Sequence, residues 1–155
     1  MIILKSERDL EAMRPACGVA AAVLDDIAAF IRPGITTRQV DDHAAECIRS
    51  YGARSAFLGY RKYPCHTCIS VNEEVVHGLA NERVLRFGDI VSVDCGVLYR
   101  GFIGDNARTV AVGGCGVAAQ RQIVDYPARQ IDRAGQPRRV DRHAAGRVQR
   151  ALQVF

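Results

Sequence analysis

Residues 89–109 read DIVSVDCGVLYRGFIGDNART. Two runs rich in strand-forming residues flank the dipeptide Arg100-Gly101, a pattern typical of a β-hairpin with a two-residue turn. Such a turn places Asp94 opposite Ala107 and makes Asp94 and Asp105 diagonal neighbours. We therefore expect the two carboxylates on one face of a ribbon, with backbones about 7–8 Å apart.

Two carboxylates this close cannot both remain ionised in a low-dielectric site without a cation. Asp94 lies within an apolar strand, and Gly96 and Gly104 leave room for close approach of other groups. Converging carboxylates suit oxygen-preferring divalent metals, bound singly or as a pair. The sequence thus favours half of a metal site over the alternative, in which one Asp is a solvent-exposed turn or edge residue.

Two helices are expected before the strands. Ser6 and Asp9 are close to a capping box, and apolar residues then recur at three- and four-residue spacing as far as Arg32-Pro33-Gly34. A second helix begins at Thr36 and ends at Tyr51-Gly52.

From residue 54 the pattern changes to short runs of strand-forming residues separated by Gly, Pro, Asn and charged residues. The expected strands are Ser55–Leu58, Cys68–Val71, Val75–His77, Ile90–Leu98 and about Phe102 to Val112. Because two helices precede antiparallel strands without βαβ alternation, we predict an α+β fold with an antiparallel sheet and flanking helices.

Composition narrows the class of protein. The 155 residues are 48% hydrophobic and 25% charged, as in ordinary globular domains, and we expect no transmembrane span and no signal peptide. The six cysteines are spread through helical and strand-like segments, which favours reduced thiols in the cytoplasm. Residues 126–155 hold seven Arg and two Asp, so the net positive charge belongs to that tail. We expect neither a nucleic-acid surface nor a membrane partner.

Two further motifs have open interpretations. His77 follows a β-branched pair at a strand end, where such a residue is more often structural than catalytic. The motif Cys65-His66-Thr67-Cys68 suggests zinc or redox chemistry, but one C-x-x-C without a second pair is weak evidence.

Three aromatic residues precede this motif: Phe57, Tyr60 and Tyr63. With Cys68 beyond them, they are consistent with plain packing. They are equally consistent with an apolar pocket for one side chain of a substrate.

Together these residues resemble the type I methionine aminopeptidases of peptidase family M24. The similarity rests on several motifs in order, from about Ser6 to Asp125: Ser55-Ala56-Phe57-Leu58-Gly59-Tyr60, Tyr63-Pro64, Cys68-Ile69-Ser70-Val71-Asn72-Glu73, Val76-His77-Gly78, Gly88-Asp89-Ile90-Val91-Ser92-Val93-Asp94 and Gly101-Phe102-Ile103-Gly104-Asp105. The resemblance implies the N-terminal half of a pita-bread (creatinase/aminopeptidase) fold, whose two related α+β halves surround a dinuclear divalent-metal site.

The resemblance also implies roles for individual residues. Asp94 would be a bidentate metal ligand, Asp105 would bridge two metal ions, and His77 would contact the substrate near the scissile amide. The aromatic residues and Cys68 would line the pocket for the N-terminal methionine. The implied reaction is hydrolysis of that methionine from nascent chains by a metal-bridged hydroxide. The resemblance does not distinguish among Co, Mn, Fe, Zn and Ni as the metal. The ribosome is a candidate partner, and we expect a monomer.

The family's second half supplies another His and two Glu as ligands, one of them the general base. Here no Glu follows Glu82, and His143 is the single His beyond Asp105. We therefore expect a truncated or frameshifted copy with little or no activity.

In this interpretation residues 1–125 form the aminopeptidase-like half, and residues 126–155 form a poorly ordered tail unrelated to the family. Two alternatives remain open. One is a non-catalytic peptide-binding module of the same fold, and the other is a zinc-binding protein that uses Cys65 and Cys68.

Overall fold

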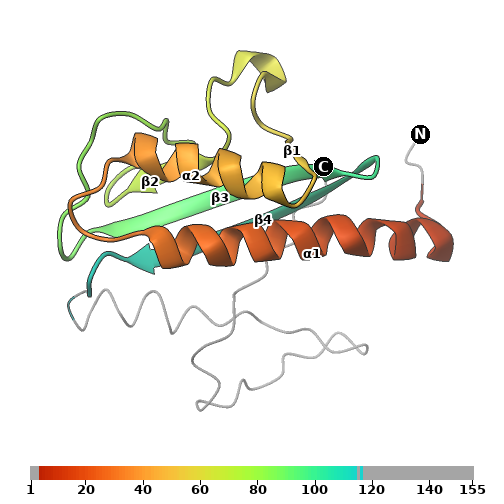
Figure 1. Cartoon of the computed structure of the whole chain (residues 1–155), viewed down its shortest axis with the longest axis horizontal. Coiled ribbons are helices and arrows are strands. Elements are labelled where there is room, and N and C mark those ends of the chain that lie inside the picture. The colour runs from red at the N-terminus through yellow and green to blue at the C-terminus, as the bar shows by residue number, and fades with distance from the viewer. Residues whose placement is uncertain (1–3, 115, 117–155) are drawn as a thin grey trace, which may run out of the picture.

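The computed structural model describes residues 4–114 and 116 of the chain. This part consists of two helices and a four-stranded antiparallel sheet (Figure 1). Helix α1 (Glu7–Phe30) and helix α2 (Thr37–Ser50) lie side by side against one face of the sheet. The predicted α+β class, with an antiparallel sheet and flanking helices, is confirmed.

Both helices begin at capping boxes. The Ser6 hydroxyl accepts the backbone N–H of Asp9, and the Asp9 carboxylate accepts the backbone N–H of Ser6. Thr36 and Gln39 form the same reciprocal pair at the start of α2. Each box satisfies N–H groups that the first helical turn leaves without partners, so the predicted helix starts are confirmed.

The central strand of the sheet is β3. The strands are β1 (Arg54–Ser55), β2 (Cys68–Val71), β3 (Ile90–Tyr99) and β4 (Phe102–Ala111). One edge of β3 pairs with β4, and its other edge pairs with β2 and then β1. The loop between β1 and β2 contains the 3₁₀ turn η1 (Tyr60–Lys62) and projects away from the sheet (Figure 1).

The hairpin between β3 and β4 has the predicted two-residue turn. Arg100 and Gly101 both have positive φ, 50° and 83°, as a type I′ turn requires. The strands pair without interruption from Tyr99 opposite Phe102 to Ile90 opposite Ala111. Asp94 lies opposite Ala107, so the predicted register is confirmed.

The two faces of β3 have opposite characters. Val91, Val93, Cys95 and Val97 point toward the helices and are at most 1% exposed. They form one core with fully buried residues of both helices, among them Leu24, Ile27, Val40 and Ile48. The alternate residues, including Asp94, lie on the face away from the helices.

Two predicted strands are wrong. In Ser55–Leu58 the strand ends at Ser55, because the Ser55 hydroxyl accepts the backbone N–H groups of Phe57 and Leu58 and turns the chain. Val75–His77 lies in a loop, with Val75 83% exposed. Only the next residue, Gly78, reaches β2, where its carbonyl accepts the Ile69 N–H at 3.1 Å.

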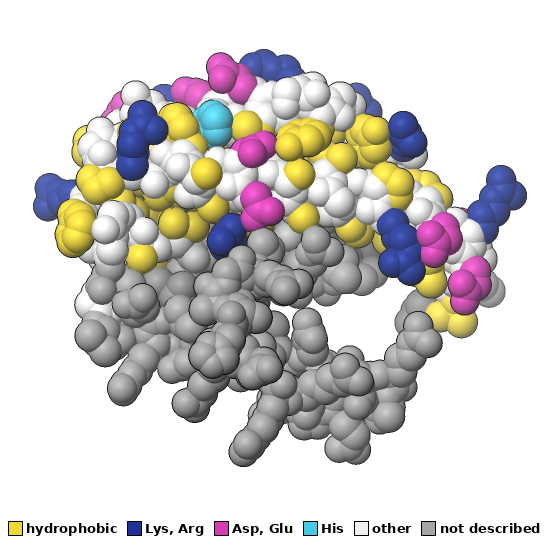
Figure 2. All heavy atoms as spheres, turned by 60° about the horizontal axis from the view of Figure 1, so that its bottom comes forward, with side chains coloured by type: hydrophobic (Ala, Val, Ile, Leu, Met, Phe, Trp, Pro, Cys, Tyr) yellow, Lys and Arg dark blue, Asp and Glu magenta, His cyan; other side chains and the backbone are white. Residues whose placement is uncertain are grey.

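The described surface carries charges of both signs. On the face drawn in Figure 2, acidic and basic side chains are interspersed with hydrophobic ones, and no basic stripe gathers on its coloured part. Among residues 4–114 and 116, neither helix has the combined length and apolarity needed to span a membrane. Residues 126–155, and the predictions for them, lie outside the described residues.

Candidate metal and substrate site

Asp94 and Asp105 lie on the same face of the β3–β4 ribbon, as predicted. Asp94 belongs to β3, and Asp105 belongs to β4 opposite Gly96. The period of two along a strand keeps both carboxylates on the face away from the helices. Both side chains are partly buried.

Burial acts on both carboxyl groups, and the neighbouring carboxylate adds to its effect at Asp105. Burial raises the pKa of Asp94 above its ordinary value. For Asp105, burial together with the neighbouring Asp94 carboxylate raises the pKa to about 7. The protein therefore holds two carboxylates where two negative charges are unfavourable, and a bound cation would relieve this.

Cys68 joins these residues from the neighbouring strand. It lies in β2 directly opposite Asp94 and is 6% exposed. Burial raises the pKa of its thiol to about 11, so the sulfur is protonated at neutral pH. Cys68 thus forms an apolar wall beside the carboxylates, since a protonated thiol behaves as a small hydrophobic group.

Phe57 covers the same face at Gly96. A Cβ atom on Gly96 would lie 2.5 Å from Cε1 of Phe57, so any larger residue there would displace this ring. The rings of Phe57 and Tyr63 meet edge to face with centroids 6.5 Å apart. Because Gly96 and Asp94 share a strand face, the structure brings Phe57, Tyr63 and Cys68 together near the carboxylates.

Tyr60 and His77 are less closely connected to this cluster. Tyr60 lies in η1 and is 62% exposed, with the Arg61 guanidinium 5.5 Å from its ring centroid. His77 is exposed in the loop after β2. Among the described contacts, none joins either side chain to Asp94 or Asp105.

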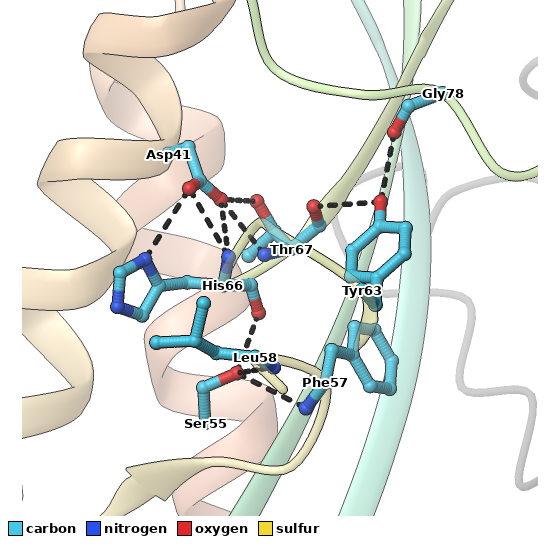
Figure 3. A network of polar contacts seen from close by, with 8 residues as sticks. All are labelled: Asp41, Ser55, Phe57, Leu58, Tyr63, His66, Thr67 and Gly78. Atoms are coloured by element: carbon cyan, nitrogen blue, oxygen red, sulfur yellow. Dashed lines mark hydrogen bonds and ion pairs between the residues drawn. The ribbon is translucent and has the colours of Figure 1, made fainter. Parts of the chain in front are cut away.

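Asp41 is a polar residue of this region that the sequence did not reveal. Its carboxylate is buried in α2, where it accepts the backbone N–H groups of His66 and Thr67 and the Thr67 hydroxyl at 2.7 Å (Figure 3). His66 Nδ1 lies 3.3 Å from the same carboxylate. A signal was present, because Asp41 lies four and seven positions before the buried Ala45 and Ile48.

The Asp41 interactions continue to the aromatic cluster. The Tyr63 hydroxyl donates toward the carbonyl oxygens of Thr67, at 3.3 Å, and Gly78, at 3.0 Å. The Ser55 hydroxyl donates to the His66 carbonyl at 2.9 Å (Figure 3). One buried carboxylate on α2 therefore fixes the loop that carries Tyr63 and leads into Cys68.

The C-x-x-C motif does not form a zinc site among the described residues. Cys65 packs in the core beneath the helices, whereas Cys68 lies on the strand face that carries Asp94. Within residues 4–114 and 116, no group of three or more His, Cys, Asp or Glu side chains gathers to hold a metal ion.

The donor chemistry of Asp94 and Asp105 nevertheless fits a divalent cation. Carboxylate oxygens are the ligands that hard divalent ions prefer, and a cation would counteract the raised pKa that burial and Asp94 give to Asp105. Two carboxylates are fewer ligands than a tightly held metal ion requires.

Comparison with known proteins agrees with this geometry. The model of metallopeptidase family M24 matches residues 11–136. A methionine aminopeptidase of Clostridium perfringens is 43% identical over 123 residues, which cover 79% of this chain and 49% of that protein. The chain thus spans about half the length of this curated relative.

Solved structures show the same fold. The methionine aminopeptidase of Rickettsia prowazekii is 36% identical with a TM-score of 0.80, over 84% of this chain and 53% of that one. A Xaa-Pro dipeptidase of Bacillus anthracis is 27% identical with a TM-score of 0.67. The match covers 83% of this chain and 35% of the dipeptidase. The predicted pita-bread fold is confirmed, with about half of the aminopeptidase covered. The chain belongs to metallopeptidase family M24.

Proposed function

We propose that this chain provides two metal-ligating carboxylates and the methionine side-chain pocket of a methionine aminopeptidase. The observation that carries the proposal is the placement of Asp94 and Asp105 on one partly buried strand face, where burial raises the pKa of both carboxyl groups. Asp94 on β3 and Asp105 on β4 would hold the divalent metal ions of the proposed site.

The pocket lies beside the carboxylates. Phe57 and Tyr63 form an edge-to-face pair, and Cys68 with its protonated thiol adds an apolar wall. An unbranched thioether side chain is flexible and makes favourable contacts with aromatic rings, so methionine suits such a pocket. We place Tyr60 at the rim of the pocket and His77 near the scissile amide.

When bound, divalent metal ions supply Lewis acidity and an activated water for amide hydrolysis. In this proposal the chain's own residues would bind and orient the substrate: the aromatic pair would receive the side chain, and the first peptide bond would lie beside the carboxylates. The proposed substrates are nascent polypeptides in the cytoplasm, which makes the ribosome a candidate partner.

The sequence contains few further candidate ligands. No Glu follows Glu82, and the single His beyond Asp105 is His143. Metal affinity increases with the number of charged ligands, so we expect weak metal binding and negligible release of methionine by the chain alone.

Calorimetric titration of the full chain with Mn²⁺ tests the metal site. We expect binding that is weakened at least tenfold by Asp94→Asn and by Asp105→Asn, while Asp42→Asn, at an exposed position of α2, leaves it unchanged. Equal affinity in all four proteins would refute the metal role. Release of methionine from Met-Ala peptides, measured with added Co²⁺ or Mn²⁺, tests the expected inactivity, and turnover typical of an aminopeptidase would contradict it.

A second candidate function is peptide binding without catalysis. The contact between Phe57 and Tyr63, and the hydrogen bonds of Tyr63, involve neither Asp94 nor Asp105, so this pocket can form without metal. Binding of a Met-Ala-Ser peptide that is equal in EDTA and Mn²⁺ and is weakened by Phe57→Ala would favour this function. Affinity that requires Mn²⁺ would favour the metal-dependent site.

A further inference from the structure

Gly78, the residue after His77, is held against strand β2. Its N–H donates to the Ser70 hydroxyl at 3.1 Å, and its carbonyl oxygen accepts the Ile69 N–H at 3.1 Å. The Tyr63 hydroxyl donates to the same carbonyl oxygen at 3.0 Å (Figure 3). Hydrogen bonds from β2 and from the loop before it therefore converge on this one residue.

This position requires glycine because two backbones meet there. A Cβ atom on Gly78 would lie 2.0 Å from the backbone oxygen of Ile69 and 2.9 Å from the Cα of Ser70. Both atoms belong to β2, whose pairing with β3 holds them in place. The close contact fixes the main chain directly after His77.

The residues before Gly78 lack such support. Val75 and Val76 are 83% and 66% exposed, and His77 is exposed as well. Among the described residues, every hydrogen bond that joins residues 75–78 to another segment involves Gly78. The placement of His77 therefore depends on the hydrogen bonds of its neighbour.

Tyr63 connects this anchor to the candidate pocket. Its ring meets the ring of Phe57 edge to face, whereas its hydroxyl, at the far end of the ring, reaches Gly78. The Thr67 carbonyl lies 3.3 Å from the hydroxyl, beyond the usual O–H···O range, so Gly78 is the better acceptor. One side chain thus contacts the pocket through its ring and the His77 segment through its hydroxyl.

We propose that Tyr63 is a positioning residue for His77, acting through the Gly78 carbonyl while the Ser70 hydroxyl holds the Gly78 N–H. Without these hydrogen bonds the exposed loop would open more often, and His77 would lie beside a bound peptide for less of the time. The contact of His77 with a peptide rests on the proposed function, whereas the attachment of Gly78 to β2 does not.

A double-mutant cycle for binding of a Met-Ala-Ser peptide tests this role. Calorimetric titration in Mn²⁺ compares the full chain with Tyr63→Phe, His77→Ala and the variant that carries both changes. Tyr63→Phe keeps the ring and loses one hydrogen bond, so we expect the affinity to fall about three- to tenfold. The same substitution should leave the affinity of His77→Ala unchanged, because the residue that the hydroxyl positions is then absent.

Two results of the cycle would overturn the inference. Equal losses in both backgrounds would mean that the hydroxyl acts on the pocket directly, and a Tyr63→Phe protein that binds as tightly as the parent would mean that it has no role. If circular dichroism shows Tyr63→Phe to be unfolded, Ser70→Ala removes the other side-chain bond to Gly78 and replaces it in the cycle.

Hydrogen exchange of the Gly78 amide provides a measurement that needs no peptide. Tyr63→Phe and Ser70→Ala should each accelerate it about three- to tenfold. Tyr51→Phe is the matched control, because it removes a hydroxyl that donates to Asp26 at 3.2 Å at the end of α2, and it should leave the exchange unchanged.

The outcomes separate this inference from the proposed function. If the peptide binds, the cycle decides. If the peptide does not bind, the methionine pocket fails, and the exchange decides: faster exchange of Gly78 in Tyr63→Phe supports the anchoring of the His77 segment, and an unchanged rate refutes it.

Discussion

The two faces of strand β3 differ in what their side chains contribute to the molecule. Val93 points toward the helices and is 1% exposed in a core of aliphatic side chains, whereas the next residue, Asp94, shares its face with a second carboxylate. The first face stabilises the fold, and the second concentrates unfavourable charge. Because side chains alternate along the strand, residues that stabilise the fold lie on one face and the candidate site residues lie on the other.

The largest expected difference between the faces concerns two glycines. A Cβ on Gly104 would lie 2.2 Å from the backbone oxygen of Ala16 in α1, which cannot move aside, whereas a Cβ on Gly96 would meet only the movable ring of Phe57. We expect Gly104→Ala to lower the free energy of unfolding by about 3 kcal/mol and Gly96→Ala by about 1 kcal/mol. Urea denaturation measures both.

Gly18 in α1 provides the control for this pair, because a Cβ there would meet nothing within 4 Å. Gly18→Ala should raise the free energy of unfolding by about 0.5–1 kcal/mol, since alanine favours the helix. Equal losses for Gly96→Ala and Gly104→Ala would mean that the site face is packed as rigidly as the core face.

An intermediate effect is expected at Asp41, which connects the helix layer to the loop of the site. Asp41→Ala leaves the Thr67 N–H and hydroxyl without their acceptor, and we expect a loss of about 2 kcal/mol in the free energy of unfolding. Hydrogen exchange of the His66 and Thr67 amides should accelerate more than that of the core strands. Asp42→Asn serves as the exposed control, and unchanged exchange in Asp41→Ala would show that the carboxylate does not hold the loop.

A further expected effect concerns pH and the site face alone. Asp105 has a pKa of about 7 in the folded protein and an ordinary value of 3.8. Between these values the folded chain keeps a proton that the unfolded chain has released, so the free energy of unfolding should fall as pH rises from about 4 to 7. Urea denaturation in EDTA should show this slope, and Asp105→Asn should reduce it. If the free energy of unfolding of the unsubstituted protein did not fall over this pH range, the raised pKa of Asp105 would be contradicted.

The sequence predicted the hairpin and the helices well because local chemistry specifies them. A two-residue turn with two positive φ angles leaves one register, which placed Asp94 and Asp105 on one face. Ser6 and Thr36 each start a capping box that fixes a helix start within one residue.

The remaining features depend on contacts between distant segments, which sequence patterns do not encode. Val75 and Val76 have high strand propensity but remain exposed, because only Gly78 reaches β2. Helical spacing places Asp41 on the buried face of α2, but it does not specify that the carboxylate bonds to Thr67, 26 positions away. Residue types on β2 suggested a wall at Cys68, but its position opposite Asp94 required the β2–β3 register.

The short turn at Arg100-Gly101 determines where this protein can change in length. A residue inserted inside either strand between Asp94 and the turn, or between the turn and Asp105, would rotate one carboxylate to the helix side. Residues inserted at the turn itself leave the pairing of the strands unchanged. Reporter peptides or natural insertions are therefore best accommodated at the tip of this hairpin, where the chain can lengthen while both carboxylates stay in phase.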